Sequence, residues 1–323
     1  MDAIDARDMF WLAEQRQALK QARAAGRFPH AILIQALAGC GGEALCRFVA
    51  QAVLCKQGDA PCGSCRECLL AARVSHPDVH WVGVEEKKSL IAVDQIRNLT
   101  EKLTMTSYES GGSVAVIAPA DRMHVASSNA LLKTLEEPRP GVTIVLLTAW
   151  PGRLLPTITS RCLLLRVAVP PREPTLAWLR AQYGQRDWSA ALAMCGNAPL
   201  AAAENDAAEL AAIRTDTFRA MDAIATGRLS PPGPASDWSR AEHYRWRMAG
   251  IENWITTRIE ALLAIPQQPH LPAPGAAQKI AQCSRLLESA YELIRQSDSP
   301  LNKALGLERL FWQTSRLNNT GLQ

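Results

Sequence analysis

The chain has 323 residues, enough for two or three domains with a sizeable core. Hydrophobic residues make up 48% of it and charged residues 20%, which excludes a disordered chain, and the net charge of +4 is far below the concentrated basic stripe that requires a nucleic-acid partner. No apolar run approaches the roughly 20 residues of a membrane span, and Met1–Asp8 is too acidic for a signal peptide, so we expect a cytoplasmic protein without a membrane partner.

The first half of the chain alternates short apolar runs with helical stretches, which is the pattern of a parallel α/β domain. The predicted strands are Ala31–Ile34, Val79–Val82, Val114–Ile117, Thr143–Leu147 and Cys162–Val167. The predicted helices between them are Glu43–Cys55, Ile91–Leu103 and Ser128–Glu137. The last of these begins with serines suited to capping and stops at Pro138.

A glycine-rich turn follows the first predicted strand, with Gly39, Gly41 and Gly42 ahead of Glu43. An ATPase carries G-x-x-x-x-G-K-[S/T] at this place. In the best register Gly42 replaces the lysine and Glu43 the magnesium-binding hydroxyl; in the next register Glu43 stands for the lysine and Ala44 for the hydroxyl. A carboxylate there repels a triphosphate, so we expect a degenerate phosphate loop that holds no ATP.

A group of four cysteines begins at the end of the next predicted helix as C-x6-C-x2-C-x2-C: Cys55, Cys62, Cys65 and Cys68. Four thiolates around one small volume match a tetrahedral structural zinc site and leave no open position for catalysis. A redox C-x-x-C pair is the alternative, but it accounts for only two of the four residues. We therefore expect one zinc ion that fixes an insertion onto the α/β domain.

A second nucleotide motif is also altered. In an ATPase the strand at Val114–Ile117 ends in Asp-Glu, where the aspartate holds magnesium and the glutamate orients water. Here Ala118 and Pro119 occupy those two positions, and neither can bind a cation or activate a nucleophile. The sequence therefore predicts that two separate parts of one catalytic site are missing.

Beyond the proline cluster Val169–Pro174, which predicts a domain boundary, no strand pattern is present. A small helical unit is expected at Thr175–Tyr183, Trp188–Cys195 and Ala201–Ala212. Longer helices are expected at Ala211–Gly227, Ser236–Ala264, Gly275–Ser297 and Asn302–Leu317.

Two segments between the altered motifs and the proline cluster point to a family. Ser128–Pro138 and Leu154–Cys162 closely resemble the signature segments of the clamp-loader branch of AAA+ ATPases. The Arg27–His30 entry, the four-cysteine insertion and the motif Ser160-Arg161-Cys162 occur there in the same order. With both nucleotide motifs altered, the chain resembles a non-hydrolysing subunit of the bacterial DNA polymerase III clamp loader.

This resemblance implies an AAA+-like domain at residues 1–168, a small helical lid at 169–209 and a helical collar at 210–323. It implies a complex with gamma or tau ATPase subunits and a delta subunit that loads the sliding clamp onto primer-template DNA. No intrinsic activity is implied, only membership of the DNA polymerase III holoenzyme, a DNA-directed DNA polymerase. Within the ring Arg161 would act in trans as an arginine finger, with possible support from Ser160 and Lys133.

Two other functions stay open at this point. The first is an active ATPase of the gamma/tau type, which Gly42, Ala118 and Pro119 oppose. The second is a zinc-containing repair protein that binds DNA alone, which the modest charge and the cysteine spacing oppose.

Overall fold

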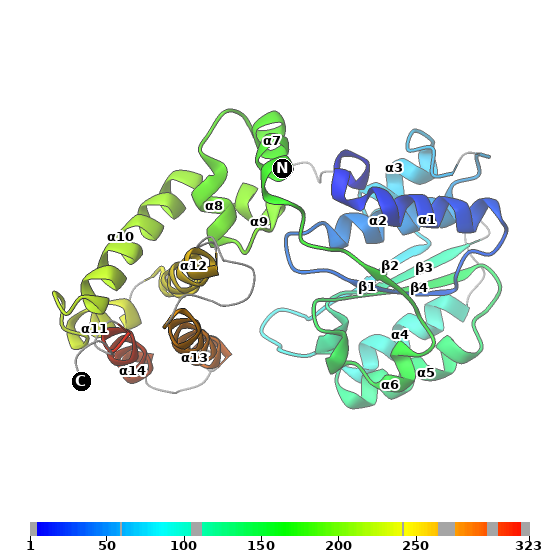
Figure 1. Ribbon diagram of the computed structural model, residues 1–323. Helices are drawn as coiled ribbons and strands as arrows, with labels where there is room; N and C mark the ends of the chain where they lie inside the picture. Colours follow the sequence, from blue (N-terminus) through cyan, green and yellow to red (C-terminus); the bar gives the residue numbers. More distant parts are fainter. Residues whose placement is uncertain are drawn as a thin grey trace. The chain divides into compact units, whose positions relative to one another are not determined.

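The computed structural model describes residues 5–58, 60–104, 112–240, 242–263, 275–295 and 303–317. It contains two compact units, Met1–Pro171 and Arg172–Gln323 (Figure 1). The division falls inside the predicted proline cluster. The finer division of the second unit into a lid at 169–209 and a collar at 210–323 stays a prediction.

The first unit is built on a five-stranded sheet with the strand order β2-β3-β4-β1-β5, in which all neighbours are parallel. Its strands are β1 Ala31–Gln35, β2 Val79–Val82, β3 Ser113–Ile117, β4 Val142–Thr148 and β5 Leu163–Arg166. The residues of β3 are all buried, as expected of a central strand covered on both faces. All five predicted strands are present, and the predicted α/β fold class is confirmed.

Helices cover both faces of this sheet (Figure 1). On one face lie α1 Ala13–Ala24, α2 Gly42–Leu54 and α3 Arg66–Ala72; on the other lie α4 Val93–Thr104, α5 Val125–Glu136 and α6 Pro156–Thr159. Four single 3-10 turns complete the unit: η1 Ala6–Asp8, η2 Phe10–Leu12, η3 Ala120–Arg122 and η4 Pro151–Arg153. The parallel strands direct their carboxyl ends to one edge of the sheet, and the glycine-rich loop after β1 and the segment after β3 both begin at this edge.

In this unit the sequence prediction missed three helices, α1, α3 and α6, and misplaced the start of α5. Helix α5 begins three residues before the predicted Ser128, and its N-terminal cap is His124, whose Nδ1 accepts a hydrogen bond from the Ala126 N–H at 3.2 Å. Ser127 and Ser128 are buried inside the helix instead. The Ser127 hydroxyl donates to the Ile91 carbonyl at 2.8 Å, so it satisfies a buried acceptor outside its own helix.

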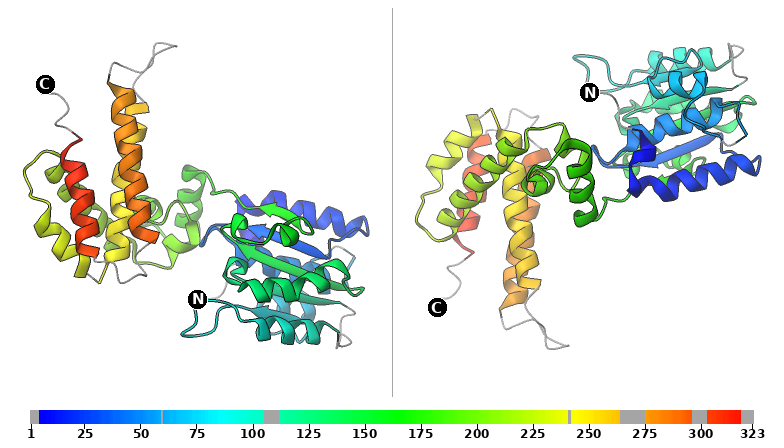
Figure 2. Two further views of the ribbon diagram at one scale, coloured as in Figure 1. Left: turned by 90° about the horizontal axis from the view of Figure 1, so that it is seen from below. Right: turned by 90° about the horizontal axis from the view of Figure 1, so that it is seen from above.

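The second unit is helical throughout its described residues (Figure 2). Its helices are α7 Arg172–Tyr183, α8 Trp188–Met194, α9 Pro199–Ala203, α10 Ala207–Ala225, α11 Pro232–Arg240, α12 Tyr244–Leu263, α13 Ala276–Arg295 and α14 Lys303–Ser315. The predicted single helix at Ser236–Ala264 is wrong, because the chain turns between α11 and α12. Helix α11 packs on α14 while α12 packs on α10 and α13, and one straight helix cannot do both. None of the described helices is both long and apolar enough to cross a bilayer.

The core of the second unit joins α10 to α14 through large apolar side chains. Trp238 on α11 meets Phe311 on α14 edge to face, with ring centroids 5.3 Å apart. Trp254 on α12 is buried, and its indole N–H donates to Asp222 of α10 at 2.9 Å. Both tryptophans therefore serve helix packing.

Candidate functional site

The glycine-rich loop joins β1 to α2 and needs its glycines for two separate reasons. Gly39 and Gly41 have φ angles of +78° and +88°, in the left-handed region that favours glycine. Gly42 is buried, and a Cβ atom there would lie 2.6 Å from Leu147 Cδ1 and 2.9 Å from Ala36 Cβ. In the best register Gly42 stands at the lysine position, so the packing leaves no room for a lysine stem.

The chain's own N-terminal segment packs against this loop. Met9 and Leu12 are fully buried, and a Cβ atom on Gly41 would lie 2.7 Å from Met9 Sδ and 3.2 Å from Leu12 Cδ1. The Trp11 indole N–H donates to the Cys40 carbonyl at 2.9 Å. Side chains of the N-terminal segment therefore pack directly against the loop at Cys40 and Gly41. Sequence reasoning missed this segment; the run Met9–Leu12 before a helix was its only signal.

Glu43, the second altered position, lies in the first turn of α2. Its side chain is 69% exposed, and its carboxylate lies 3.9 Å from the Arg47 guanidinium one helical turn later. The charge of Glu43 is therefore screened by solvent and by a cation.

The segment after β3 contains a carboxylate that the motif comparison overlooked. Ala118 and Pro119 directly follow β3, and Asp121 lies in η3 with its side chain nearly buried. The Thr148 hydroxyl, at the end of β4, donates to Asp121 Oδ1 at 2.6 Å, and Arg153 lies 3.8 Å from Oδ2. Asp121 therefore ties the ends of β3 and β4 together.

The four predicted zinc ligands lie around one point. Their sulfur atoms are all within 4.8 Å of one another, with 4.0 Å between Cys62 and Cys68 and 3.9 Å between Cys65 and Cys55. A tetrahedral zinc ion with Zn–S bonds of about 2.3 Å separates its sulfur ligands by about 3.8 Å, so the four cysteines match the size of such a site. Backbone N–H groups of Ser64 and Cys65 lower the pKa of the Cys62 thiol to about 6, which favours the metal-binding thiolate.

Buried polar contacts hold this cysteine cluster against the sheet. Helix α3 packs on α2, and Gln51 of α2 donates to the Cys68 carbonyl at 3.0 Å. Beside it, His76 Nε2 lies 2.7 Å from Glu67 Oε2. His76 Nδ1 accepts from the Asp78 N–H at 3.0 Å, so the proton is on Nε2 and is donated to Glu67. The pair joins α3 to the start of β2.

Arg161 and Ser160 lie on the surface in the short turn between α6 and β5. The Arg161 guanidinium donates to the Thr157 carbonyl at 2.9 Å and forms an ion pair with Glu136 of α5 at 2.7 Å. Its side chain is 36% exposed, and the Ser160 hydroxyl lies 3.4 Å from it. The arginine therefore has no role in core packing, and its contacts can be exchanged for others.

Lys133 lies on α5 three residues before Glu136, so the partner of Arg161 is its neighbour on the helix surface. Leu131 and Leu135 are buried and Lys133 is exposed, along an open groove of about 320 Å³ between α4 and α5. Ser160, Arg161 and Lys133 thus belong to neighbouring elements, whereas the glycine-rich loop and the cysteine cluster are separate features of the unit.

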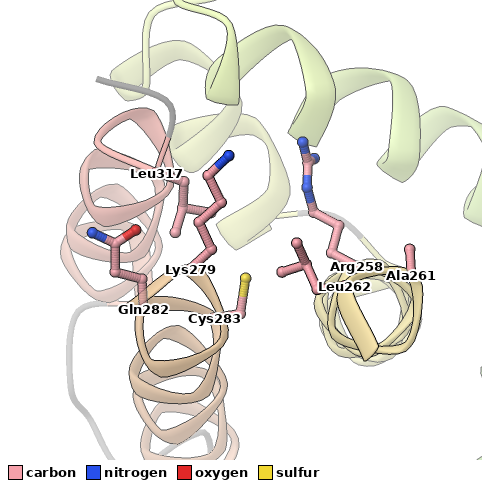
Figure 3. Close-up of a pocket in the computed structure, with 7 residues that line it drawn as sticks. All are labelled: Arg258, Ala261, Leu262, Lys279, Gln282, Cys283 and Leu317. Carbon is pink, nitrogen blue, oxygen red and sulfur yellow. The ribbon is translucent and has the colours of Figure 1, made fainter. Parts of the chain in front are cut away.

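The second unit contains a pocket of about 340 Å³ between α12, α13 and Leu317 (Figure 3). Arg258 at its rim already pairs with Asp222 at 3.0 Å and stacks over Trp254 at 4.3 Å. Burial raises the pKa of the Cys283 thiol, which keeps it protonated. The pocket is therefore a gap between packed helices and not a reactive centre.

A parallel sheet with a glycine-rich loop between its first strand and the next helix defines a phosphate-loop α/β domain, here joined to a helical unit. A family model described as DNA polymerase III, delta subunit, matches residues 11–171. The chain is 36% identical to DNA polymerase III subunit delta' of Escherichia coli K12 over 71% of this chain and 67% of that protein. It is 29% identical to the Pseudomonas aeruginosa delta' subunit over 90% of this chain and 93% of that protein. The chain belongs to the DNA polymerase III delta' family, which confirms the resemblance to clamp-loader proteins.

Among solved structures, a DNA polymerase III gamma subunit-related protein of Thermotoga maritima aligns over 94% of this chain and 99% of its own length. Its TM-score is 0.47 and its sequence identity 18%. This likeness is too distant to add to the sequence matches.

Proposed function

We propose that this chain is a non-hydrolysing subunit of a clamp loader. It supports the ATP-dependent loading of a sliding clamp onto primed DNA, together with gamma or tau ATPase subunits and a delta subunit. It holds one structural zinc ion on Cys55, Cys62, Cys65 and Cys68. It binds no ATP itself, and Arg161 contacts the ATP of a neighbouring subunit.

The packing above the phosphate loop carries this proposal. Met9 and Leu12 contact the site of a Cβ atom on Gly41, and Trp11 hydrogen bonds to the loop. A triphosphate needs the backbone N–H groups of such a loop and a cation, and neither Gly42 nor the segment Ala118–Pro119 supplies the cation. A subunit built this way contributes to ATP hydrolysis only through its neighbours.

The position of Arg161 supports the role in trans. A planar, permanently charged guanidinium suits the negative charge that spreads over phosphoryl oxygens during hydrolysis. Arg161 is exposed, and its partner Glu136 is itself half exposed, so a triphosphate can replace that ion pair at low cost. Lys133, one turn along α5, adds a second positive charge beside it.

The test is the ATPase rate of clamp-loader complexes reconstituted with Arg161→Ala. A trans arginine is worth roughly 10³–10⁵ in rate at its own site. The loss for the whole complex is smaller, because other sites keep their own arginines. Arg161→Lys should rescue poorly, since a point charge does not reproduce the planar fork.

Arg97→Ala is the matched control, because Arg97 is an exposed arginine of the same unit paired with a carboxylate at 3.4 Å. It should leave the rate unchanged. Complexes with Arg161→Ala that assemble fully and hydrolyse ATP at the wild-type rate would show that Arg161 is an ordinary surface residue.

A further inference from the structure

The N-terminal segment, residues 5–12, contacts the cysteine cluster near one end and the phosphate loop near the other. In its first turn the Arg7 guanidinium donates to the Cys62 carbonyl at 3.4 Å. Further along, the Trp11 indole N–H donates to the Cys40 carbonyl of the phosphate loop at 2.9 Å. Because only a short stretch of chain separates the two contacts, a displacement of Arg7 also moves the residues that pack on the loop.

Gly63, which lies between Cys62 and Cys65, leaves room for the Arg7 guanidinium. A Cβ atom on Gly63 would lie 1.3 Å from Arg7 Nη1 and 2.2 Å from its Cζ, so the guanidinium occupies the place of a side chain. Asp5 fixes the same guanidinium: Arg7 Nε donates to Asp5 Oδ1 at 3.0 Å, and Nη2 pairs with Oδ2 at 2.5 Å. Such a two-point ion pair sets the plane and direction of an arginine. Arg7 is therefore oriented toward the cysteine cluster by its own segment.

A second arginine reaches the cluster from the last turn of α1. Arg23 donates through Nη2 to the Cys55 carbonyl and through Nη1 to the Val53 carbonyl at 3.3 Å. Both carbonyls belong to the C-terminal end of α2, where unpaired carbonyls and the helix dipole favour a cation. Arg7 and Arg23 thus approach the cluster from separate elements, and each donates to the backbone of one of the four cysteines.

Metal binding strengthens both contacts for two reasons. A zinc ion fixes the loop that carries the four sulfur atoms, and with it the carbonyls that accept these hydrogen bonds. Four thiolates and one doubly charged ion also leave two net negative charges on the loaded site, which attract the two guanidinium groups. Residues that hold the ligands of a metal from outside are worth roughly 10–100-fold in metal affinity.

We infer that Arg7 and Arg23 position the metal-binding loop through its backbone carbonyls, and that through Arg7 metal binding fastens the N-terminal segment to the phosphate loop. This coupling rests on the zinc ion of the proposed function and not on ATP or on neighbouring subunits. Both arginines act through the ligand residues, because they donate to carbonyl oxygens and not to the ion. Coupling between two sites is reciprocal, so the docked segment favours metal by the same factor by which metal favours docking.

The first experiment measures metal affinity in the full-length protein. Zinc is removed with a chelator under reducing conditions, Co²⁺ is titrated in while the cobalt–thiolate absorption is followed, and zinc then displaces the cobalt. We expect Arg7→Ala and Arg23→Ala each to weaken zinc binding about 10-fold or more. Met9→Ala, which loosens the segment at the phosphate loop, should weaken it by a smaller factor through the reciprocal coupling.

Arg172→Ala is the matched control, because Arg172 donates to the Ser189 carbonyl at 3.3 Å within the second unit. It removes the same kind of contact from an arginine to a backbone carbonyl, and it should bind zinc like the wild type. Circular dichroism of every variant checks that the fold is retained.

The second experiment follows the segment itself by amide hydrogen exchange and mass spectrometry. In the wild type, removal of zinc should speed exchange at Met9 and Leu12 at least about 10-fold, because their N–H groups donate within the turns of the segment. Strand β3 should exchange slowly in both forms, since its core does not depend on the segment. In Arg7→Ala the segment should exchange fast with or without zinc.

Equal exchange of the segment in the loaded and the chelated wild type would overturn the inference, as would wild-type zinc affinity in Arg7→Ala. Equal acceleration of β3 on chelation would also overturn it, because the metal would then stabilise the whole unit. Normal zinc binding by all variants refutes only the coupling and leaves the proposed zinc site standing. A wild-type protein that binds neither zinc nor cobalt refutes the zinc site of the proposed function, and the coupling with it.

Discussion

Gly41 belongs to the phosphate loop and contacts the N-terminal segment. Adding one methyl group at this position therefore tests both the backbone conformation of the loop and its packing against Met9. Gly41→Ala adds a side chain in the left-handed region and places it 2.7 Å from Met9 Sδ. The backbone strain costs about 1–2 kcal/mol and the overpacking about 1–3 kcal/mol more. Gly26→Ala is the control, because Gly26 has a φ of +65° and nothing within 4 Å of its Cβ site. It measures the strain alone.

Urea unfolding of both variants gives the two costs. We expect the free energy of unfolding to fall distinctly further for Gly41→Ala than for Gly26→Ala. In a protein that already carries Met9→Ala, the further loss caused by Gly41→Ala should be smaller than in the wild type. Equal losses would mean that Met9 does not pack on the loop.

The thiols of this chain should differ widely in reactivity once metal is removed. The thiolate is the nucleophile, so a pKa of about 6 leaves Cys62 mostly ionised at pH 7.5, whereas burial raises the pKa of Cys40, Cys162 and Cys195 to about 11 and keeps them protonated. After chelation, iodoacetamide should therefore modify Cys62 first, and added zinc should protect it. Peptide mass spectrometry checks this, and early labelling of Cys40 would contradict it.

At the scale of elements, the N-terminal turn η2 packs against the loop before α2. Restoring a single charged residue should not restore ATP binding, because Met9 and Leu12 pack against the loop at Gly41 and the segment after β3 still lacks the acidic pair. Gly42→Lys should bind no Mg-ATP in a calorimetric titration and should also lose stability, since a Cβ atom there meets Leu147 and Ala36. Micromolar binding by the wild type or by a folded Gly42→Lys protein would contradict the proposed absence of nucleotide.

The two units of the whole molecule each have a hydrophobic core of their own. The first unit buries the sheet residues with α4, α5 and α6, and the second buries α10 to α14 around Phe311. All described strand pairs lie within the first unit. A domain of the size of the first unit buries about 70% of the surface that its unfolded chain exposes, and this burial suffices for independent folding.

We therefore expect residues 1–171 to fold alone and to retain one zinc ion. Cooperative thermal unfolding followed by circular dichroism, with elemental analysis for zinc, checks this. The fragment 172–323 is measured in the same way for comparison, and it should contain no zinc. A first unit that binds no zinc or unfolds without a transition would show that its core depends on the second unit.

The sequence by itself determined the local features. Short runs of apolar residues located all five strands. A strand that is buried on both faces is apolar at successive positions, so its own sequence is enough to recognise it. The spacing of Cys55, Cys62, Cys65 and Cys68 predicted a cluster for the same reason, since fourteen successive residues need only local turns to meet. The signature segments identified the family.

Only the tertiary structure decided the features that join distant residues. Met9 and Leu12 reach Gly41 across about thirty positions. Glu136 of α5 meets Arg161 in the turn after α6, and Asp121 in η3 meets Thr148 at the end of β4. The turn between α11 and α12 likewise follows from what each helix packs against, not from its own residues. Such contacts depend on the path of the whole chain, whereas periodicity in a sequence reports only which face of an element is buried.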